Sequence, residues 1–215
     1  MKNILLLLTT LLFIGSVFAQ KNFEGQIEYE ITYEDMAPEL KAQESMLPKK
    51  MTTQIKGEFS KTIQPSIAGD QVSITNNKTN ESLVLINIMG QKLAIKTTKE
   101  DFENSRKEQE EALDIEYLDE EKVILGYNCK KAIIKTSEAD LTVYYTNELP
   151  SMAVSDQVNQ IDGFPLQIIM NTEMMTHITT AKSVAEKSID ISMEVPEGYT
   201  VKTLEEFQKM FGGGL

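Results

Sequence analysis

Residues 121–150, with the sequence EKVILGYNCKKAIIKTSEADLTVYYTNELP, carry the pattern that decides the fold. In LTVYYT at 141–146 the more apolar side chains recur at every second position, which is the period of a β-strand. The polar run TSEAD at 136–140 separates this segment from an apolar run before it and predicts a turn. We therefore predict two long strands joined by one turn, with further antiparallel sheet laid around this hairpin.

The alternation is clearest near the start of the chain, in FEGQIEYEITYE at residues 23–34. Phe23, Ile27 and Tyr29 fall on one side of the predicted strand, and the glutamates fall on the other. A strict period of two predicts one buried face and one solvated, acidic face, as an antiparallel sheet allows. Further strand patterns, separated by turns that contain Gly or Asn, lie at 52–63, 71–76, 82–89, 92–97, 164–170, 174–182 and 188–195.

Three segments predict helices. Residues 35–48 begin with Asp35 as a candidate N-cap and have Pro38 in the first turn. Residues 100–113, EDFENSRKEQEEAL, predict a charged, solvated helix. The run TLEE at 203–206 has the pattern of a capping box and predicts a helix at the C-terminus.

Residues 1–19 have the pattern of a cleavable signal peptide. Lys2 gives a positive start, a short apolar stretch follows, and Val-Phe-Ala precedes Gln20 as a cleavage site. The apolar stretch is too short for a membrane anchor, no cysteine follows it to take a lipid, and no later segment is long enough to span a bilayer. We predict an exported protein, in the periplasm or outside the cell, with a single β-rich domain over residues 20–215.

The chain is acidic, with 33 Asp and Glu residues against 21 Lys and Arg residues. Its net charge is −12 at pH 7, and losing Lys2 with the signal peptide makes it −13. Nucleic acids and anionic membranes would repel such a protein, so we predict neither as a partner. The single cysteine, Cys129, excludes an internal disulfide and is expected to be a small buried core residue.

The sequence motifs of common enzyme classes are absent. The chain has no G-x-S-x-G, no HExxH, no P-loop and no CxxC. His177, the only histidine, cannot build a zinc site without several carboxylates, and no spacing selects a pair among the many glutamates. We predict a protein that is not an enzyme, with no catalytic residues, no metal and no cofactor. A hydrolase would require a buried carboxylate pair or a contact between Cys129 and His177.

Methionine is the residue type that suggests a ligand. The chain has 11 methionines, of which 10 remain when Met1 is removed with the signal peptide. Met is flexible and polarizable, so a wall rich in Met suits apolar ligands of variable shape. The same property makes Met a filler of ordinary cores, and this is its more frequent role.

Four short motifs occur in a characteristic order. They are F-x-G-x-I-x-Y at 23–29, I-L-G-Y-x-C-K-K-A at 124–132, G-F-P-L at 163–166 and V-P-E-G-Y at 195–199. Together with the signal peptide they resemble a family of exported bacterial proteins, common in Gram-negative species of the Bacteroidetes type, that carries a domain of unknown function. The resemblance implies a fold similar to the periplasmic lipoprotein carriers: a curved antiparallel sheet or incomplete β-barrel with helices plugging the concave side. It supplies no activity and no catalytic residues.

Two functional hypotheses follow for such a fold. In the first, a non-enzymatic periplasmic protein holds a lipid, an acyl chain or a lipoprotein anchor in the concave face by burying apolar surface. In the second, an envelope scaffold protein with a filled core and no small ligand binds a protein partner through its surface or a strand edge. For the first hypothesis the predicted ligand-binding residues are Ile27, Tyr29, Ile31, Met36, Leu40, Leu85, Val143, Tyr145, Ile168 and Met170.

Overall fold

The structure is a computed structural model that describes residues 23–67, 69–88, 90–101, 103–104, 114–136, 139–151, 158 and 161–211. The predicted signal peptide at 1–19 lies outside these residues, as does most of the predicted charged helix at 100–113. The structure describes residues 99–101 and 103–104 at the start of this segment, and they are helical.

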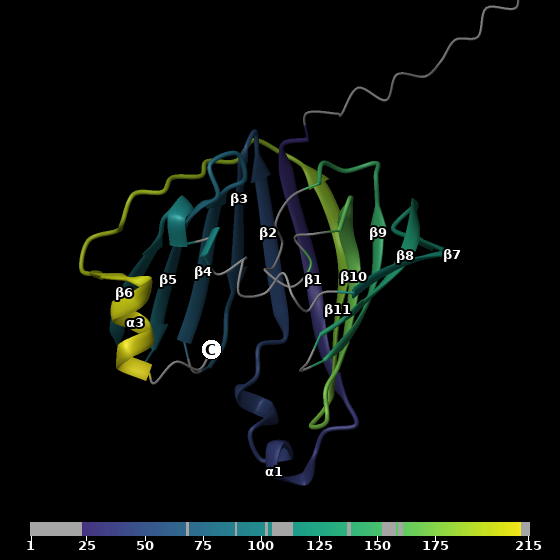
Figure 1. Cartoon of the computed structure of the whole chain (residues 1–215), viewed down its shortest axis with the longest axis horizontal. Coiled ribbons are helices and arrows are strands. Elements are labelled where there is room, and N and C mark those ends of the chain that lie inside the picture. Colours follow the sequence, from purple (N-terminus) through teal and green to yellow (C-terminus); the bar gives the residue numbers. More distant parts are fainter. Residues whose placement is uncertain are drawn as a thin grey trace, which may run out of the picture.

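One large curved sheet makes up most of the described chain (Figure 1). It has 12 strands in the spatial order β12-β6-β5-β4-β3-β2-β1-β11-β10-β9-β8-β7. The strands are β1 (Gly25–Glu34), β2 (Lys50–Lys56), β3 (Phe59–Gln64), β4 (Gly69–Asn76), β5 (Glu81–Ile88), β6 (Gln91–Thr97), β7 (Asp114–Ile124), β8 (Tyr127–Lys135), β9 (Asp140–Thr146), β10 (Phe164–Asn171), β11 (Thr176–Glu186) and β12 (Thr200–Thr203).

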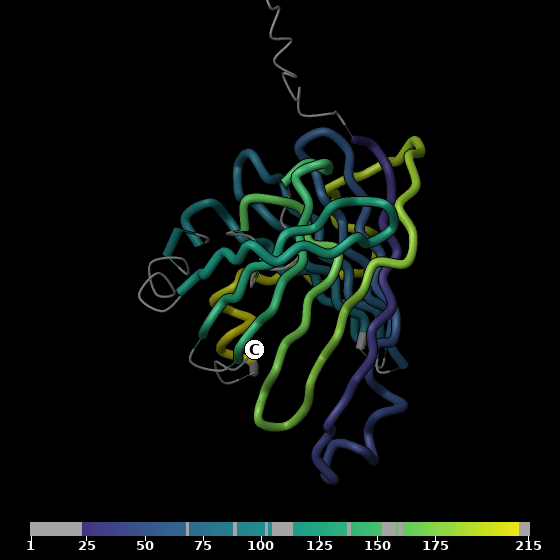
Figure 2. Tube along the Cα trace, turned by 90° about the vertical axis from the view of Figure 1, so that its right-hand side faces the viewer, coloured from purple at the N-terminus to yellow at the C-terminus, as the bar shows by residue number. Residues whose placement is uncertain are grey.

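The sheet consists of two runs of antiparallel neighbours joined through β1. Strands β2 to β6 pair in chain order, as do β7 to β11, and β1 lies between β2 and β11. Only the short β12 pairs in parallel, with β6. The curvature is visible from the front in Figure 1 and from the β7 side in Figure 2. The predicted class, a mainly β protein with a curved antiparallel sheet and a few helices, is confirmed.

The segment at 121–150 differs from its prediction as a two-stranded hairpin. Its first residues end β7, and Leu125-Gly126 forms a tight turn into β8, with φ of 53° and 85°. The predicted turn at 136–140 then connects β8 to β9. Two consecutive residues with positive φ form the turn type that suits a two-residue hairpin, but Asn or Gly is usual at the first position. The turn was not predicted, because Leu125 is apolar and continues the apolar run before it.

Strand register assigns each side chain to one of two faces. Cross-strand partners project to the same face of a sheet, so the assignment can be carried from strand to strand. Ile27 lies opposite Thr53, which lies opposite Thr62. Glu28 lies opposite Thr52, and the same row continues through β3 and β4 to Leu85 on β5. We call the two sides the Ile27 face and the Glu28 face.

The largest part of the core surrounds β1 and β8 to β11 and lies mainly on the Ile27 face. Its buried residues fall into two clusters. The first contains Phe23, Ile27, Tyr29, Ile31, Met51, Ile55, Ile124, Cys129, Leu149, Phe164, Leu166 and Ala181. The second contains Ala132, Ile134, Leu141, Val143, Tyr145, Val158 and Ile161. Val158 and Ile161 belong to the loop between β9 and β10, so described parts of this loop cover the sheet.

A third cluster lies on the opposite face of β4 to β6. Its buried residues are Ile74, Leu83, Leu85 and Ala94. They are covered by Ile191, Met193, Val195 and Tyr199 from residues 187–199, which we call the strap. The strap carries the chain from β11 to β12 along the outside of β3 to β6 (Figure 1). The prediction of a strand at 188–195 is wrong, because this segment is coil that alternates over a sheet surface without joining a ladder.

The helices are short and lie at the ends and the edge of the sheet (Figure 1). Instead of one helix over 35–48, α1 spans Pro38–Lys41 and a separate 3₁₀ turn spans Glu44–Met46. Asp35 does not cap α1, since its φ is 50° and the N-cap position is Ala37. Helix α3 (Leu204–Phe211) follows β12 and packs against β12 and β6.

Candidate functional site

Three of the four motifs that carry the family resemblance meet in the first core cluster, and the fourth, at 195–199, packs on the third cluster. Tyr29 of the first motif donates its hydroxyl to the Pro165 carbonyl of the third, with an O–O distance of 2.9 Å. Both residues are almost fully buried, and burial raises the pKa of the Tyr29 phenol. Gly163 has no room for a side chain, because a Cβ there would lie 2.3 Å from Cδ2 of Tyr145. These motif residues build the fold and do not present reactive groups.

Cys129 and His177, the pair that a hydrolase would require, have separate environments. Cys129 is buried, its Sγ lies 3.6 Å from the Tyr127 carbonyl, and burial raises the pKa of its thiol to about 11. His177 stacks on Tyr33 with 5.2 Å between ring centroids, and burial lowers the pKa of its imidazole. The thiol therefore stays protonated at neutral pH, as expected for a structural core cysteine.

The residues predicted to line an apolar cavity mostly share the Ile27 face. Ile31 lies in one row with Ile168 and Val143, through Thr179 of β11. Ile27 and Tyr29 belong to the first core cluster, Val143 and Tyr145 to the second, and Ile168 and Met170 pack against the second. Met36 is buried beside α1, and Leu40 in α1 is half-buried. That a ligand contacts these residues stays a prediction.

The prediction that Leu85 lies with these residues is wrong. It lies in the row of Glu28 and belongs to the third cluster, on the opposite face of the sheet from Ile27. The cause is the unbroken apolar run at 83–86, which contains no alternation. Without alternation the sequence does not fix which residues face which side, and a register error of one residue exchanges the faces.

A network of polar side chains lies on the Glu28 face of β7 to β11. It comprises Glu120, Lys122, Lys131, Tyr144, Gln167 and Thr180, which we call the Tyr144 cluster. Lys131, Tyr144, Gln167 and Thr180 are successive cross-strand partners on β8, β9, β10 and β11. Adjacent strands therefore place these side chains in one row, and the two remaining residues reach it from β7.

Short contacts hold the Tyr144 cluster together. Tyr144 donates its hydroxyl to Glu120 Oε1 at 2.7 Å, and Lys131 Nζ lies 2.8 Å from Glu120 Oε2. Lys122 donates to Gln167 Oε1 at 2.8 Å, and its Nζ lies 4.9 Å from the centroid of the Tyr144 ring. Gln167 in turn donates from Nε2 to Thr180 Oγ1 at 2.9 Å. The ring is thus surrounded by an amide, a carboxylate and two ammonium groups.

The charges of this cluster are set by its hydrogen bonds. The hydrogen bonds from Lys131 and Tyr144 hold the pKa of Glu120 below its ordinary value. The same contacts raise the pKa of Lys131 and, through the bond to Glu120, the pKa of the Tyr144 phenol. Near neutral pH the Glu120 carboxylate is therefore ionised, the Lys131 ammonium group is protonated and the Tyr144 phenol is neutral.

Sequence reasoning missed this cluster. Its residues come from four consecutive strands, β8 to β11, and from β7, where Glu120 lies in the bulge between Leu118 and Glu121 and Lys122 follows it. No local motif therefore joins them. The available signal was the pair Tyr144-Tyr145, because consecutive strand residues face opposite sides. Tyr145 is buried in the core, so Tyr144 had to project to the other face, where it is half-buried against the first cluster.

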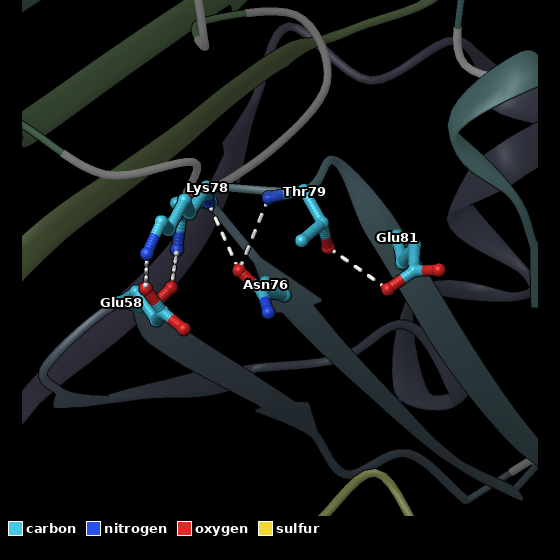
Figure 3. Close-up of polar contacts among 6 residues, drawn as sticks. Glu58, Asn76, Lys78, Thr79 and Glu81 are labelled. Carbon is cyan, nitrogen blue, oxygen red and sulfur yellow. Dashed lines mark hydrogen bonds and ion pairs between the residues drawn. The ribbon is translucent and has the colours of Figure 1, made fainter.

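A second polar group surrounds the turn between β4 and β5 (Figure 3). Asn76 Oδ1 accepts hydrogen bonds from the backbone N–H groups of Lys78 and Thr79, at 3.0 and 3.2 Å. Thr79 donates to Glu81 Oε2 at 2.9 Å, and Lys78 forms an ion pair with Glu58 at 3.6 Å. These contacts close the turn and join it to the turn between β2 and β3, so this group is structural.

Two further properties bear on the function. Within the described ranges, no helix is both long enough and apolar enough to cross a membrane. In the same part of the chain, His, Cys, Asp and Glu side chains do not gather in groups of three or more that could hold a metal ion.

The chain matches a known protein family over most of its length. Residues 27–205 match the model of the family described as N-glycanase peptide, N-terminal domain. The match covers more than half of the sequence. The chain belongs to this family. No curated protein matches it.

Solved structures show the same relationship at the level of fold. Two structures of PNGF-II, in different space groups, superpose with TM-scores of 0.58 and 0.59 at 16% sequence identity. They align with 87% and 88% of this chain but with only 33% of the PNGF-II chain. This chain therefore spans about a third of the length of PNGF-II. LprF from Mycobacterium bovis aligns at a TM-score of 0.35 and 8% identity, over 81% of this chain and 90% of LprF, which is too low to carry an inference.

The family match corrects the functional prediction. We predicted a non-enzymatic periplasmic protein that holds a lipid or lipoprotein anchor, with a scaffold without a ligand as the alternative. This prediction is wrong, because the matched family is the N-terminal domain of an N-glycanase. The protein is enzyme-related, and the resemblance to a domain of unknown function is replaced by this family. Among the predicted partners, neither a lipid nor an envelope protein is tested by the comparisons.

Proposed function

We propose that this chain is a glycan-recognition module of an N-glycanase-type protein. The observation that carries the proposal is the family match over residues 27–205, because that family is the N-terminal domain of an N-glycanase. An enzyme that acts on glycoproteins must hold a protein-linked glycan, and a separate domain can supply binding without carrying the hydrolytic site.

The Tyr144 cluster supplies the surface for this binding. A saccharide presents hydroxyl groups that both donate and accept hydrogen bonds, together with apolar C–H faces. Tyrosine offers an apolar ring with one polar end, and amide and carboxylate side chains accept or donate beside it. In this cluster Tyr144 lies next to Gln167 on one neighbouring strand and Lys131 on the other. The cluster therefore combines the exposed part of an aromatic ring with hydrogen-bonding groups.

The ionised carboxylate of Glu120 suits hydrogen bonding to a saccharide. The described carboxyls with a resolved shift are Asp101, Glu120 and Glu205, and in each the pKa is lowered by hydrogen bonds to its neighbours. Such groups stay ionised near neutral pH and accept hydrogen bonds from sugar hydroxyls.

Binding to a glycoprotein with and without its glycans tests the proposal. The chain from residue 20 is titrated against an N-glycoprotein and against the same protein after removal of its glycans. We expect binding to the glycosylated form only, and a loss of at least about tenfold in affinity in Tyr144→Ala, as for a tyrosine at the centre of a contact. The matched control is Tyr117→Ala, because Tyr117 is 52% exposed but shares its row with Ala132, on the Ile27 face.

Either of two results would contradict this function. Equal binding to both forms of the glycoprotein, or unchanged affinity in Tyr144→Ala, would exclude glycan recognition by this cluster. Release of free glycan by the chain alone, measured in the same samples, would assign hydrolysis to it instead.

We propose further that the protein acts after export. The support is the signal-peptide pattern of residues 1–19, which precedes Gln20. The protein is isolated from cell fractions of its host, and its N-terminus is sequenced. A mature chain that begins at Gln20 in the periplasm or the medium is the expected result, and an intact Met1 in the cytoplasm would contradict it.

A further inference from the structure

Two lysines contact the same tyrosine ring, but their partners differ in charge. Lys131 lies 2.8 Å from a carboxylate oxygen of Glu120 and 6.0 Å from the centroid of the Tyr144 ring. Lys122 contacts an amide oxygen of Gln167 at 2.8 Å and lies 4.9 Å from the same centroid. In the part of the chain that the structure describes, Lys122 has no carboxylate at ion-pair distance.

Within the Tyr144 cluster the positive groups outnumber the negative ones. Two ammonium groups and the single carboxylate of Glu120 sum to one positive charge, whereas the whole chain carries −12. On the neighbouring strand Lys182 lies 2.8 Å from Glu30, and Glu28 accepts from the neutral side chains of Gln26 and Ser183. Within the cluster, Lys122 is the cation whose hydrogen bond goes to a neutral amide, so it can offer a charged contact to an anion.

We infer that the Tyr144 cluster is a subsite for a carboxylate-bearing saccharide, in which Lys122 binds the carboxylate. The inference rests on the proposed glycan-binding function and narrows it to acidic sugars. A ligand carboxylate would take the place of the Gln167 amide oxygen at Lys122 Nζ. It would thereby replace a bond from the ammonium group to a neutral amide oxygen with one in which both the donor and the acceptor are charged.

The other members of the cluster select one orientation of the sugar. Glu120 is already ionised and would repel a second carboxylate, so the acidic end of the ligand lies toward Lys122 and away from Glu120. The displaced Gln167 amide and the Thr180 hydroxyl, both in the same row, can then bond to ring hydroxyls. Tyr144, between Lys131 and Gln167, offers its ring for contact with the sugar.

The test compares one glycopeptide in two forms. A biantennary N-glycopeptide with terminal sialic acids is titrated against the chain from residue 20 by calorimetry, and so is the same glycopeptide after sialidase treatment. We expect the acidic form to bind at least about tenfold more tightly. The difference should shrink between 50 and 500 mM salt, because exposed charges are screened beyond about 10 Å at 0.1 M.

Three variants locate the effect. Lys122→Gln removes the cation, and Gln167→Glu supplies Lys122 with a carboxylate from within the protein, so both should abolish the preference for the acidic form. Lys182→Gln is the matched control, because it removes a lysine on the same face that already has a carboxylate partner. Unfolding midpoints in urea verify that each variant is folded.

The outcomes separate the inference from the proposed function. Equal affinity for both glycopeptides overturns the acidic subsite and leaves glycan recognition standing. A preference that persists in Lys122→Gln, or that disappears equally in Lys182→Gln, overturns the assignment to Lys122. Binding of neither glycopeptide removes both the inference and the function on which it rests.

Discussion

At the scale of single residues, the hydroxyl of Tyr29 has the most consequential buried contact. It donates to the carbonyl of Pro165 and joins two strands that are 136 residues apart in the sequence. Removing the hydroxyl in Tyr29→Phe leaves this buried carbonyl without its donor, which costs about 1–3 kcal/mol. We expect urea unfolding to show a stability loss in this range. Tyr33→Phe is the control, because its partner, the Pro48 carbonyl, is in a half-buried site that water can reach.

His177 gives a second residue-scale prediction, on pH. Burial lowers the pKa of its imidazole in the folded protein below the ordinary value of about 6.5. The unfolded chain therefore binds the proton first as the pH falls. The contribution of the neutral imidazole to the free energy of unfolding is thus present above pH ~6.5 and is lost below it. We expect the stability of the wild type, relative to His177→Gln, to decrease between pH 7.5 and 5.5. A difference that stays constant or grows over this range would contradict the buried, neutral histidine.

At the scale of secondary structure, the capping box is a local device that can be tested alone. Thr203 Oγ1 accepts from the backbone N–H of Glu206 at 3.1 Å, and Glu206 Oε2 accepts from the backbone N–H of Thr203 at 3.0 Å. Thr203→Ala should lower the stability of α3 against local unfolding by about 1 kcal/mol, which corresponds to roughly fivefold faster amide exchange in its first turns. The exposed Thr200→Ala in the same strand is the control. Equal exchange rates in the two variants would show that the cap does not hold the helix.

The same elements show which features of the fold a sequence can reveal. The strand at 23–34 and the capping box at 203–206 were predictable, because neighbouring residues alone determine their patterns. The turn at Leu125-Gly126 was not, because its conformation is imposed on a leucine by the strands that it joins. The strap has the alternation of a strand, yet it packs on the sheet without pairing, which is a tertiary property.

The candidate site was less predictable than the fold. The predicted apolar face follows from strand alternation and was placed correctly for β1, β9 and β10. The Tyr144 cluster instead depends on the order of β7 to β11 and on the bulge in β7, neither of which a single sequence specifies. Its polar residues also have the composition of an ordinary solvated face, so charge alone does not distinguish them.

At the scale of the whole molecule, the core changes face along the sheet. Around β1 and β8 to β11 the buried residues lie mainly on the Ile27 face, and around β4 to β6 they lie on the Glu28 face under the strap. A cluster covered by one coil segment has few alternative contacts when the strap detaches. We therefore expect β4 to β6 and the strap to open together, at a lower free energy than the larger part of the sheet.

Native-state hydrogen exchange with two matched variants tests this division. Leu83→Ala acts in the third cluster and Ile134→Ala in the second, and both side chains are almost fully buried. Each substitution should lower the free energy of unfolding by about 2–5 kcal/mol. Leu83→Ala should accelerate exchange in β4 to β6 while leaving sub-global protection in β8 to β10 unchanged, and Ile134→Ala should lower the protection of β8 to β10. Equal acceleration of all strands by both variants would show that the two faces unfold as one unit. Separate responses would mean that the half carrying the Tyr144 cluster keeps its geometry when the strap side opens.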